Sequence, residues 1–520
     1  MTYKWLRVFR VAIASMSLLL IGLAFLDFTG LFPDKLMKGV LWLQFIPSLL
    51  TFAGVFSAAG LGFILVMLVT AFFGRFYCAS ICPLGIFQDV VLRIARLFKK
   101  IKFRYHRPIK YVRHVLLGLT IISGLMGSML AVSFLDPYSI FGRIFSDLFR
   151  PVVKAANNLL VPIFQSFDNY SFYYIDYYLL DFSVYFVAIA FLALIIILTV
   201  KHGRLYCNTV CPVGTLLGYI SRFSFFRIRI DTNNCTLCKQ CVQVCKAECI
   251  SLKSQTVDYT RCISCYNCLT VCKFDAIDLT VRKSQSNNVV NKETPTDSGR
   301  RQALKTIVGG LVLAPLASLG KDQELYYTAT VPVKRTQFVT PPGSGSVPEF
   351  LTKCTACHLC VSACPTNVIQ PSSSEFGWEH FMQVRMDYFA GYCTFECTRC
   401  TEICPTGALL PLKQDDKKLT QLGQVKFVED NCIVKTENTD CGSCAEHCPT
   451  KAVYMAPYKN GLRIPEVNDK ICIGCGACEY ACPTRPFRAI FVEGNEVHVM
   501  AEKPKEKQAE NPDHEDDFPF

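Results

Sequence analysis

The sequence predicts an α-helical membrane domain of four to five crossings, followed by small α+β domains built around cysteine clusters. Long uncharged runs dominate before residue 230, whereas cysteine, proline and charged residues recur after it. The 29 cysteines return in C-x-x-C clusters, which favours metal ligation over the disulfides of small secreted proteins. A chain of 520 residues is long enough for several domains.

The composition divides the chain into six segments. We expect a membrane domain, a first cysteine-rich domain, a linker, a signal-like or anchoring segment, a second cysteine-rich domain and a tail, at residues 1–230, 231–280, 281–299, 300–320, 321–500 and 501–520.

Four apolar runs are long enough to cross a bilayer, which takes about 17–25 residues. They cover residues 8–26, about 53–73, 115–135 and 182–200. The second lies within 36 uncharged residues that Pro47 is expected to divide. Ten Lys or Arg occur from Arg75 to Arg113, against three in 136–181, which places the N-terminus and the 75–113 loop in the cytoplasm. This asymmetry predicts a multi-pass protein of the bacterial inner membrane and accounts for the net charge of +12 without nucleic acid.

One sequence motif, the repeated phrase, occurs twice. GRFYCASICPLG occupies residues 74–85 and GRLYCNTVCPVG occupies 203–214, each after an apolar run. The membrane domain therefore resembles a duplicated helix pair whose corresponding ends meet, so that Cys78, Cys82, Cys207 and Cys211 share one site. An Fe–S cluster, another metal or two redox disulfides would suit four thiols there. The alternative is that these cysteines pack as small apolar residues.

Two further features of this half have ordinary interpretations. A b-type haem would need axial ligands such as histidine, but His114 and His202 lie at the predicted boundary and not inside a crossing. The aromatic run at 171–182 could shape a quinone pocket, although such residues more often form the interfacial belt.

The first cysteine-rich domain carries CTLCKQCVQVC at 235–245 and CISCYNCLTVC at 262–272. Both follow C-x2-C-x2-C-x3-C, the spacing of bacterial two-cluster ferredoxins, in which the fourth cysteine serves the other cluster. The spacing assigns one [4Fe–4S] cluster to Cys235, Cys238, Cys241 and Cys272, and a second to Cys262, Cys265, Cys268 and Cys245. A zinc site is the alternative.

Two lysines depart from the ferredoxin pattern. Lys246 and Lys273 stand where proline usually follows the fourth cysteine. A cation near a cluster would raise the reduction potential of the cluster, whereas solvated lysines would leave it unchanged. Cys249 has no place in the spacing and is expected to be a spare buried thiol.

A polar linker leads to an export-like segment. Arg300 and Arg301 precede 15 uncharged residues at 306–320, a length that suits a signal peptide better than a crossing. Twin arginines indicate export of a folded protein, and the missing cleavage site suggests that the segment stays as a fifth anchor. The alternative is a buried helix of a soluble domain.

The second cysteine-rich domain predicts four more [4Fe–4S] clusters, which brings the total to six. The spacing leaves open how the four cysteine groups pair. They could pair sequentially, the first with the second, or in a nested way, the first with the fourth. The sixteen predicted ligands, in groups that each end before a proline, are Cys354, Cys357, Cys360 and Cys364; Cys393, Cys397, Cys400 and Cys404; Cys432, Cys441, Cys444 and Cys448; and Cys472, Cys475, Cys478 and Cys482.

Residues 1–280 resemble the NapH/MauN type of membrane ferredoxin in their crossings, the repeated GR-x-YC-x3-CP-x-G and the two-cluster domain. Residues 299–500 resemble the exported NapG/MauM type of four-cluster ferredoxin, also in the approach TPPGSGSVPEFLTKC. The chain therefore resembles a fusion of both. The resemblance implies that electrons pass between membrane quinol, or a cytoplasmic donor, and a periplasmic oxidoreductase.

Cluster-binding cysteines without an acid/base pair, nucleophilic triad or nucleotide loop predict an electron carrier, and any activity would be quinol dehydrogenation by resemblance. Membrane lipid, quinone and a periplasmic or membrane redox protein are the expected partners. Residues 231–300 would be cytoplasmic and 321–520 periplasmic. The alternative function is reduction of a metal or cofactor during maturation of another metalloenzyme. A cation-coupled pump is disfavoured because the predicted crossings hold no carboxylate.

Overall fold

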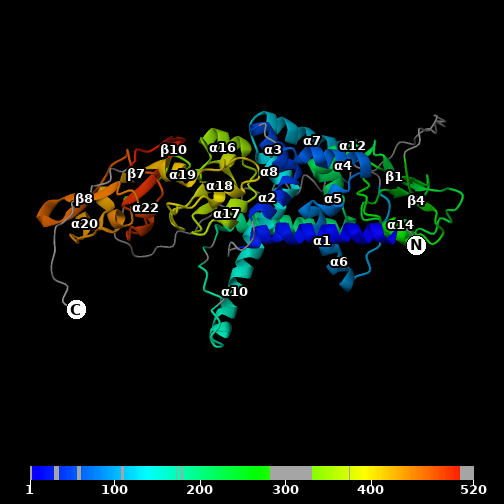
Figure 1. Ribbon diagram of the computed structural model, residues 1–520, viewed down its shortest axis with the longest axis horizontal. Helices are drawn as coiled ribbons and strands as arrows, with labels where there is room; N and C mark the ends of the chain where they lie inside the picture. The colour runs from blue at the N-terminus through cyan, green and yellow to red at the C-terminus, as the bar shows by residue number, and fades with distance from the viewer. Residues whose placement is uncertain are drawn as a thin grey trace, which may run out of the picture.

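The computed structural model describes residues 3–27, 34–55, 60–106, 110–170, 172–176, 178, 180–281, 331–373 and 375–503. The molecule is elongated, with a helical body between two cysteine-rich ends (Figure 1). One end is built from residues 226–281 and the other from residues 331–503. The predicted linker after residue 281, the segment 300–320 and the tail from 504 on lie outside the described residues.

The helical body is made of apolar and amphipathic helices around a shared core that includes Ile21, Phe25, Phe141 and Leu217. Its helices are α1 (Lys4–Leu26), α2 (Asp34–Trp42), α3 (Phe45–Val55), α4 (Gly62–Phe73), α5 (Tyr77–Ser80), α6 (Pro83–Phe98), α7 (Lys110–Leu125), α8 (Leu130–Leu135), α9 (Pro137–Arg143), the π-helical η2 (Ile144–Phe149), α10 (Arg150–Gln165), α11 (Phe182–His202), the π-helical η3 (Tyr206–Val210) and α12 (Pro212–Ser221).

The sequence predicted four to five crossings, and the candidate fifth, at 300–320, lies outside the described residues. Within the described residues, α1 and α11 are the single helices of spanning length, and α2 with α3 would make a third span if that pair, bent by 91°, crosses as one unit. The predicted crossing at 53–73 is split between α3 and α4, and the one at 115–135 is split between α7 and α8.

Local contacts explain why uninterrupted hydropathy did not give one helix at 53–73. The Ser48 hydroxyl donates to the Gly60 carbonyl and accepts from the Phe63 N–H, both at 2.8 Å, so it satisfies backbone groups that a break exposes. A Cβ on Gly62 would lie 1.8 Å from the Trp42 carbonyl oxygen, so only glycine allows this close approach. Hydropathy indicates that a segment lies in apolar surroundings. It does not indicate whether the segment forms one continuous helix.

The first cysteine-rich end has two strand pairs and two short helices. Strand β1 (Phe226–Ile230) pairs antiparallel with β4 (Ile277–Val281), so the two ends of the domain meet. The inner elements are α13 (Gln240–Val244), β2 (Ile250–Ser251), β3 (Thr256–Val257) and α14 (Asn267–Val271).

The second cysteine-rich end repeats this plan on a larger scale. Its strands pair antiparallel as β5 with β6, β7 with β10 and β8 with β9. The elements are α16 (Val347–Lys353), α17 (Leu359–Ala363), β5 (Ile369–Pro371), η4 (Trp378–His380), β6 (Val384–Met386), α18 (Arg399–Ile403), α19 (Gln414–Leu419), β7 (Thr420–Phe427), η5 (Glu429–Asn431), α20 (Ile433–Thr436), α21 (Ser443–Glu446), β8 (Val453–Pro457), η6 (Lys459–Gly461), β9 (Arg463–Val467), α22 (Ala477–Ala481) and β10 (Ile490–Met500).

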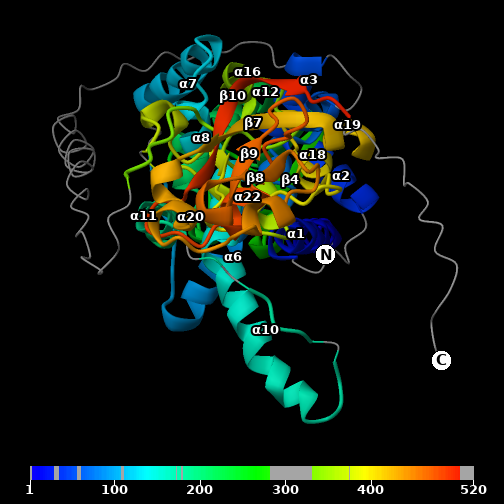
Figure 2. The same cartoon turned by 90° about the vertical axis from the view of Figure 1, so that its left-hand side faces the viewer.

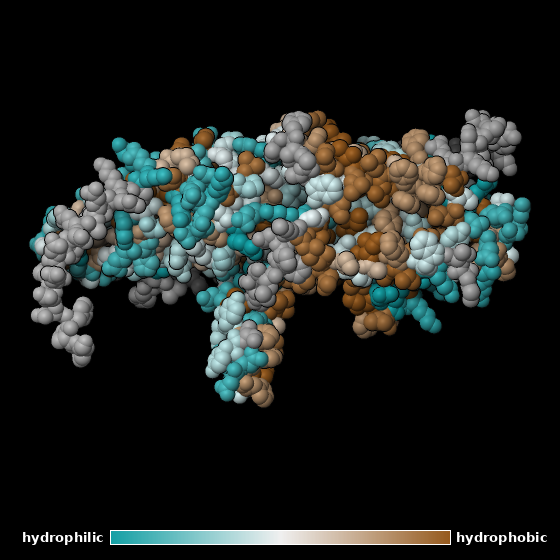
Figure 3. Space-filling view, in the orientation of Figure 1, coloured by the Kyte–Doolittle hydropathy of each residue, from teal (hydrophilic) through white to brown (hydrophobic). Residues whose placement is uncertain are grey.

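A long amphipathic helix, α10, projects sideways from the body near its junction with the second cysteine-rich end (Figures 1 and 2). Its exposed apolar side chains include Val152, Leu159 and Ile163, and Asn158 ties the returning chain to it through the Ile175 carbonyl at 2.9 Å. In Figure 3 the apolar side of this helix faces the broad apolar surface of the central helices.

Candidate metal centres

Four cysteines of the first domain, drawn from both of its motifs, lie close together. A cavity of about 330 Å³ is lined by Cys245 together with Cys262, Cys265 and Cys268, which come from the other motif. Cys249 is buried, and its sulfur lies 3.6 Å from that of Cys245, so the expected spare thiol sits beside this group.

The companion group is more open to solvent, and Cys238 is exposed. Burial, followed by the neighbouring Cys238 and Cys235, raises the pKa of the Cys241 thiol to about 11. Three thiols of one loop therefore converge, and ligation by these residues and by Cys272 stays a prediction.

The backbone explains how a short loop turns three cysteines inward. In every strictly spaced motif the residues just before and just after the second cysteine have positive φ, between +50° and +76°. Successive turns of this kind direct backbone N–H groups toward a bound anionic centre. These residues are Leu237 and Lys239, Ser264 and Tyr266, Ala356 and His358, and Gly474 and Gly476.

The effect of these N–H groups is seen at Cys354. Burial raises the pKa of its thiol to about 12, while the Ala356 N–H donates to the sulfur and acts in the opposite direction. Hydrogen bonds to cluster sulfurs stabilise their negative charge and are one determinant of reduction potential.

The first two groups of the second domain pair with each other, which answers the question that the sequence left open. Burial and then the neighbouring Cys357, Cys354 and Cys404 thiols raise the pKa of Cys360 well above its usual value, which places Cys404 with the first group. A cavity of about 320 Å³ is lined by the reciprocal set, Cys364, Cys393, Cys397 and Cys400.

The third and fourth groups pair in the same way. A cavity of about 350 Å³ is lined by Cys432, Cys441, Cys444 and Cys482. Burial and then Cys475, Cys472 and Cys448 raise the pKa of Cys478, so these four thiols form the last set. Pairing is therefore sequential, and the nested alternative does not describe this chain.

These four sets follow one another away from the helical body. The Cys393 N–H donates to the Cys475 carbonyl at 2.9 Å, which joins the two pairs. Buried Tyr388 donates to the Gly474 carbonyl at 2.7 Å from the same junction. The first pair lies next to the body and the second pair forms the far end (Figure 1).

A threonine two residues after each terminal cysteine of this domain approaches its sulfur. The Sγ to Oγ1 distances are 3.6, 3.6, 3.7 and 3.1 Å for Cys364 and Thr366, Cys404 and Thr406, Cys448 and Thr450, and Cys482 and Thr484. This contact was not predicted, although its signal is present in the sequence, where C-P-T recurs in all four groups.

Replacing Thr484 by valine is expected to lower the potential of the neighbouring cluster by about 40 mV. The Thr484 hydroxyl accepts from the Ala489 N–H at 3.0 Å, so its own proton is available to the Cys482 sulfur. A net hydrogen bond is worth about 1 kcal/mol, and about 59 mV corresponds to tenfold for one electron. EPR-monitored redox titration measures the shift. The control is Thr352→Val, which changes an exposed side chain of α16 and should leave this potential unchanged. Equal potentials for Thr484→Val and wild type would contradict the hydrogen bond.

The four cysteines of the repeated phrase come together in the middle of the molecule. Cys78, Cys82, Cys207 and Cys211 are each 4% exposed. Cys211 accepts from the Gly214 N–H at 3.2 Å at the start of α12. The structure thus places these side chains as the duplication predicts, while their ligand remains a prediction.

The arginine of each copy of the repeated phrase donates a hydrogen bond to the other copy, across this site. Arg75 donates to the Cys207 carbonyl at 2.7 Å and lies 3.8 Å from the Cys78 sulfur. Arg204 donates to the Cys78 carbonyl at 3.1 Å and lies 3.8 Å from the Cys207 sulfur. Both guanidinium groups are buried, so they stabilise negative charge on the thiols.

The glycine that ends each phrase makes room for these arginines. A Cβ on Gly85 would lie 2.7 Å from Nη1 of Arg204, and one on Gly214 would lie 2.6 Å from Nη2 of Arg75. The repeated G-R-x-Y-C-x3-C-P-x-G therefore forms the same local structure twice. The final glycine of each copy leaves room for the arginine of the other copy.

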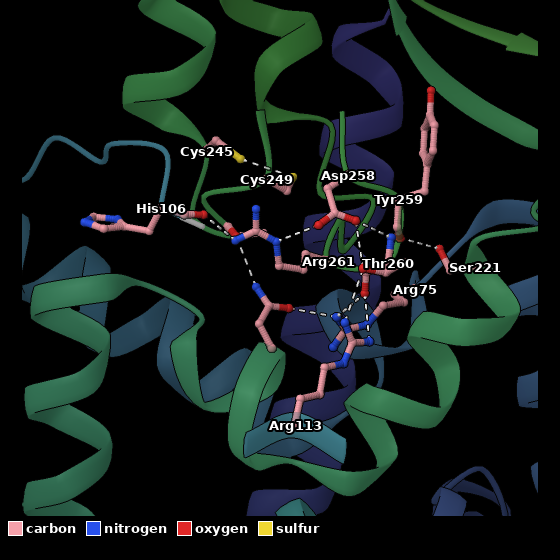
Figure 4. Close-up of polar contacts among 12 residues, drawn as sticks. Arg75, His106, Arg113, Ser221, Cys245, Cys249, Asp258, Tyr259, Thr260 and Arg261 are labelled. Carbon is pink, nitrogen blue, oxygen red and sulfur yellow. Dashed lines mark hydrogen bonds and ion pairs between the residues drawn. The ribbon is translucent and has the colours of Figure 1, made fainter. Parts of the chain in front are cut away.

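Each copy of the repeated phrase also hydrogen-bonds to the first cysteine-rich domain. The Arg204 N–H donates to the Lys246 carbonyl at 2.9 Å, and Arg75 donates to the Thr260 carbonyl at 3.2 Å. Figure 4 shows Arg75 and Arg113 converging on Thr260, where Asp258 and Arg261 also meet. The loop just before Cys262 is thereby fixed to the four-cysteine site.

Asp89 links the helical body to this domain. Its carboxylate pairs with Arg204 at 2.8 Å, Lys246 at 2.9 Å and Arg10 at 3.4 Å. Burial alone would raise the pKa of Asp89, but Arg204 and the other two cations hold it well below its usual range. Lys246 is therefore a buried ion-pair partner and not a solvated lysine, whereas Lys273 is exposed.

The second cysteine-rich domain docks at the opposite end of the body. His358, inside the first C-x-x-C group, faces the buried Asp147 carboxylate at 2.9 Å and the Met382 carbonyl at 3.0 Å. Both ring nitrogens thus face oxygen atoms of the protein. Arg150 donates to the Ser362 carbonyl at 2.6 Å beside it. The sequence offered no signal for the contacts of His358 with Asp147 and of Arg150 with Ser362, because each joins residues more than 200 positions apart.

Comparison with known sequence families supports iron–sulfur binding along the chain. A family described as "4Fe-4S binding domain" matches residues 56–102 and again 184–231, so both copies of the repeated phrase are recognised. Families described as "4Fe-4S dicluster domain" match residues 258–368, 353–409 and 439–485.

Curated relatives point to one family. The methylamine utilization ferredoxin-type protein MauM of Methylophilus methylotrophus is 34% identical over 161 residues, which are 29% of this chain and 69% of the relative. The chain belongs to the MauM family of ferredoxin-type proteins. The Escherichia coli K12 ferredoxin-type proteins NapF and NapG are each 26% identical, over 31% and 37% of this chain and 90% and 85% of their own lengths.

Membership of the MauM family confirms the resemblance stated for residues 299–500 at the level of the family. This MauM-family chain binds [4Fe–4S] clusters and has an electron-transfer role, as the multiple cluster-binding domains indicate. Its resemblance to NapH/MauN proteins, the number of six clusters and the use of quinone stay predictions.

Proposed function

We propose that this protein is a transmembrane iron–sulfur relay that passes electrons between the quinone pool or a cytoplasmic donor and a periplasmic oxidoreductase. The observation that carries the proposal is the order of the centres along the molecule. The first cysteine-rich domain, with two predicted clusters, lies at one end of the molecule, and the second, with four predicted clusters, lies at the other (Figure 1). The helical body between them carries the four buried thiols of Cys78, Cys82, Cys207 and Cys211.

The four-thiol site of the helical body supports a continuous path for electrons between the two cysteine-rich ends. Arg75 contacts both the Cys207 carbonyl of this site and the Thr260 carbonyl near Cys262. On the opposite side, a Cβ on Gly142 of α9 would lie 2.2 Å from the Cys357 carbonyl, so the first group of the second domain packs directly on the body. We infer that Cys78, Cys82, Cys207 and Cys211 hold a further redox centre, and the match of a 4Fe-4S binding family to both copies favours an Fe–S cluster.

The surface supports a bilayer around the middle of the molecule. Apolar side chains cover the central helices, whereas polar side chains predominate over the second cysteine-rich end (Figure 3). Exposed Leu19 on α1 and Phe186 and Ile197 on α11 belong to this apolar surface. Helix α10 would then lie in the interface, with Leu159 and Ile163 toward the acyl chains.

This orientation places the two cysteine-rich ends on opposite sides of the membrane. The basic loop at 75–113 lies with the first domain, which predicts the cytoplasmic side. The second domain would be periplasmic, and Arg300 and Arg301 would serve its export. Two spanning helices and the bent and broken helices between them would form the multi-pass inner-membrane domain.

The sidedness of the second domain tests the proposal directly. A tag placed at the C-terminus should be removed by protease added to intact spheroplasts, whereas a tag at the N-terminus should survive until the membrane is opened. Protection of both tags would place every cluster on one side and overturn the transmembrane relay.

The donor is tested in isolated membranes that contain the full chain. We expect a quinol to reduce the clusters rapidly and repeatedly, as judged by bleaching of their visible absorption. A slow response that stops after stoichiometric reduction of an added metal would instead support the maturation function.

A further inference from the structure

We propose that His106, His202 and Glu248 form a binding site for a divalent transition-metal ion, separate from all the cysteine groups. One ligand-type atom from each of the three lies within 4.8 Å of those from the other two. Nδ1 of His106 is 2.7 Å from Oε2 of Glu248, and the two imidazole rings lie 5.4 Å apart at 82° to each other. The site goes beyond the proposed relay and does not depend on it.

Three separate parts of the chain supply these side chains. His202 ends α11, His106 lies in the loop before α7, and Glu248 follows the fourth cysteine of the first motif. Glu248 is 5% exposed, so its carboxylate is held inside the protein and not on its surface. The turn after the fourth cysteine, in which Glu248 has a φ of +50° as Asp275 has +46° in the second motif, fixes its position.

Backbone contacts hold the three ligand-bearing segments together without using the ligand side chains. A Cβ on Gly203 would lie 2.3 Å from the Lys246 carbonyl oxygen, so the end of α11 is pressed against the loop that carries Glu248. The Phe103 N–H donates to the Gln243 carbonyl at 3.1 Å and Arg261 donates to the His106 carbonyl at 2.9 Å. Such contacts behind the ligands preorganise a metal site.

The His106 ring has room to rotate into the geometry that a bound ion needs. Its side chain is 55% exposed, and Figure 4 shows the ring directed away from the network of Asp258 and Arg261. Arg261 pairs with Asp258 at 2.9 Å, so its charge is largely compensated. Tetrahedral ligands about 2.1 Å from zinc lie about 3.4 Å apart, so small side-chain rotations would close the site.

The donor set selects the class of ion. Two imidazoles and one carboxylate suit Zn²⁺ or Fe²⁺ and disfavour Mg²⁺ and Ca²⁺, which take oxygen ligands. Water would fill the remaining position at the exposed side. A bound ion would connect the loop before α7, the end of α11 and the first cysteine-rich domain.

The test uses the full chain, purified without oxygen in detergent with its clusters loaded, and zinc as the probe. Elemental analysis after equilibration should show about one zinc per chain, and zinc K-edge absorption should show nitrogen and oxygen at about 2.0–2.1 Å. His106→Ala and His202→Ala should each weaken zinc binding by at least about tenfold, with iron content unchanged.

His114→Ala, which changes a histidine outside the three, should bind zinc as the wild type does. His106→Ala changes a half-exposed side chain and guards against loss of fold in His202→Ala. Undiminished zinc binding in both variants, or a sulfur shell at about 2.3 Å, would overturn the site.

Discussion

Replacing Cys211 by serine is expected to stop electrons from passing between the two ends of the protein while the ferredoxin-type clusters remain loaded. Cys211 is buried with Cys78, Cys82 and Cys207 between those ends. Loss of outer partners of a metal ligand already costs about 10–100-fold in affinity or activity, so loss of a ligand should slow transfer by at least about 100-fold.

The measurement uses proteoliposomes with trapped ferricyanide and external dithionite. Electrons that cross the chain reduce the ferricyanide, and its absorbance reports the rate. Ser80→Ala is the matched control, because Ser80 is buried in α5 of the same site and its hydroxyl has no hydrogen-bond partner among the described residues. Iron content and thermal stability show whether Cys211→Ser is folded. Transfer at the wild-type rate through folded Cys211→Ser would remove the four thiols from the relay.

Replacing Asp89 by asparagine is expected to destabilise the protein by about 3–5 kcal/mol. The change leaves Arg10, Arg204 and Lys246 near one another without their shared anion, and removing one partner of a buried ion pair typically costs this much. Lys246 and Arg204 connect the helical body to the first cysteine-rich domain, so this junction should open first.

Thermal unfolding of the detergent-solubilised protein measures the effect. The control is Asp278→Asn, which changes an exposed carboxylate on β4 of the same domain. A Tm equal to that of the control would show that the three cations do not depend on Asp89.

The pH dependence of this difference follows from the sign of the shift. The surrounding cations lower the pKa of Asp89 in the folded state, so its contribution is complete above the unfolded value of about 4 and is lost as the pH falls through the lowered folded value. The gap between wild type and Asp89→Asn should therefore be constant from about pH 5 to pH 8. A gap that vanished within this range would mean that Asp89 is not held ionised by its partners.

The two ends and the middle of the molecule differ in how far the sequence predicted them. The strict C-x2-C-x2-C-x3-C motifs predicted the local grouping around Cys262 and Cys354, because three thiols of one loop need only a few backbone dihedrals. The repeated phrase predicted that Cys78 and Cys207 meet, because a duplicated fold brings equivalent ends together. Hydropathy did not predict the break between α3 and α4, where a single side chain, Ser48, makes an interrupted backbone tolerable in an apolar setting.

By itself the sequence determined the iron–sulfur chemistry and the presence of long apolar helices, since both follow from short spacings and from composition. Only the tertiary structure decided that the groups of the second domain pair sequentially, that Lys246 meets Asp89, and that His106 and His202 reach Glu248. The physical reason is distance along the chain. Ligand loops are fixed by neighbouring residues, whereas these contacts depend on how separately folded parts dock, and docking is set by shape and charge summed over many residues.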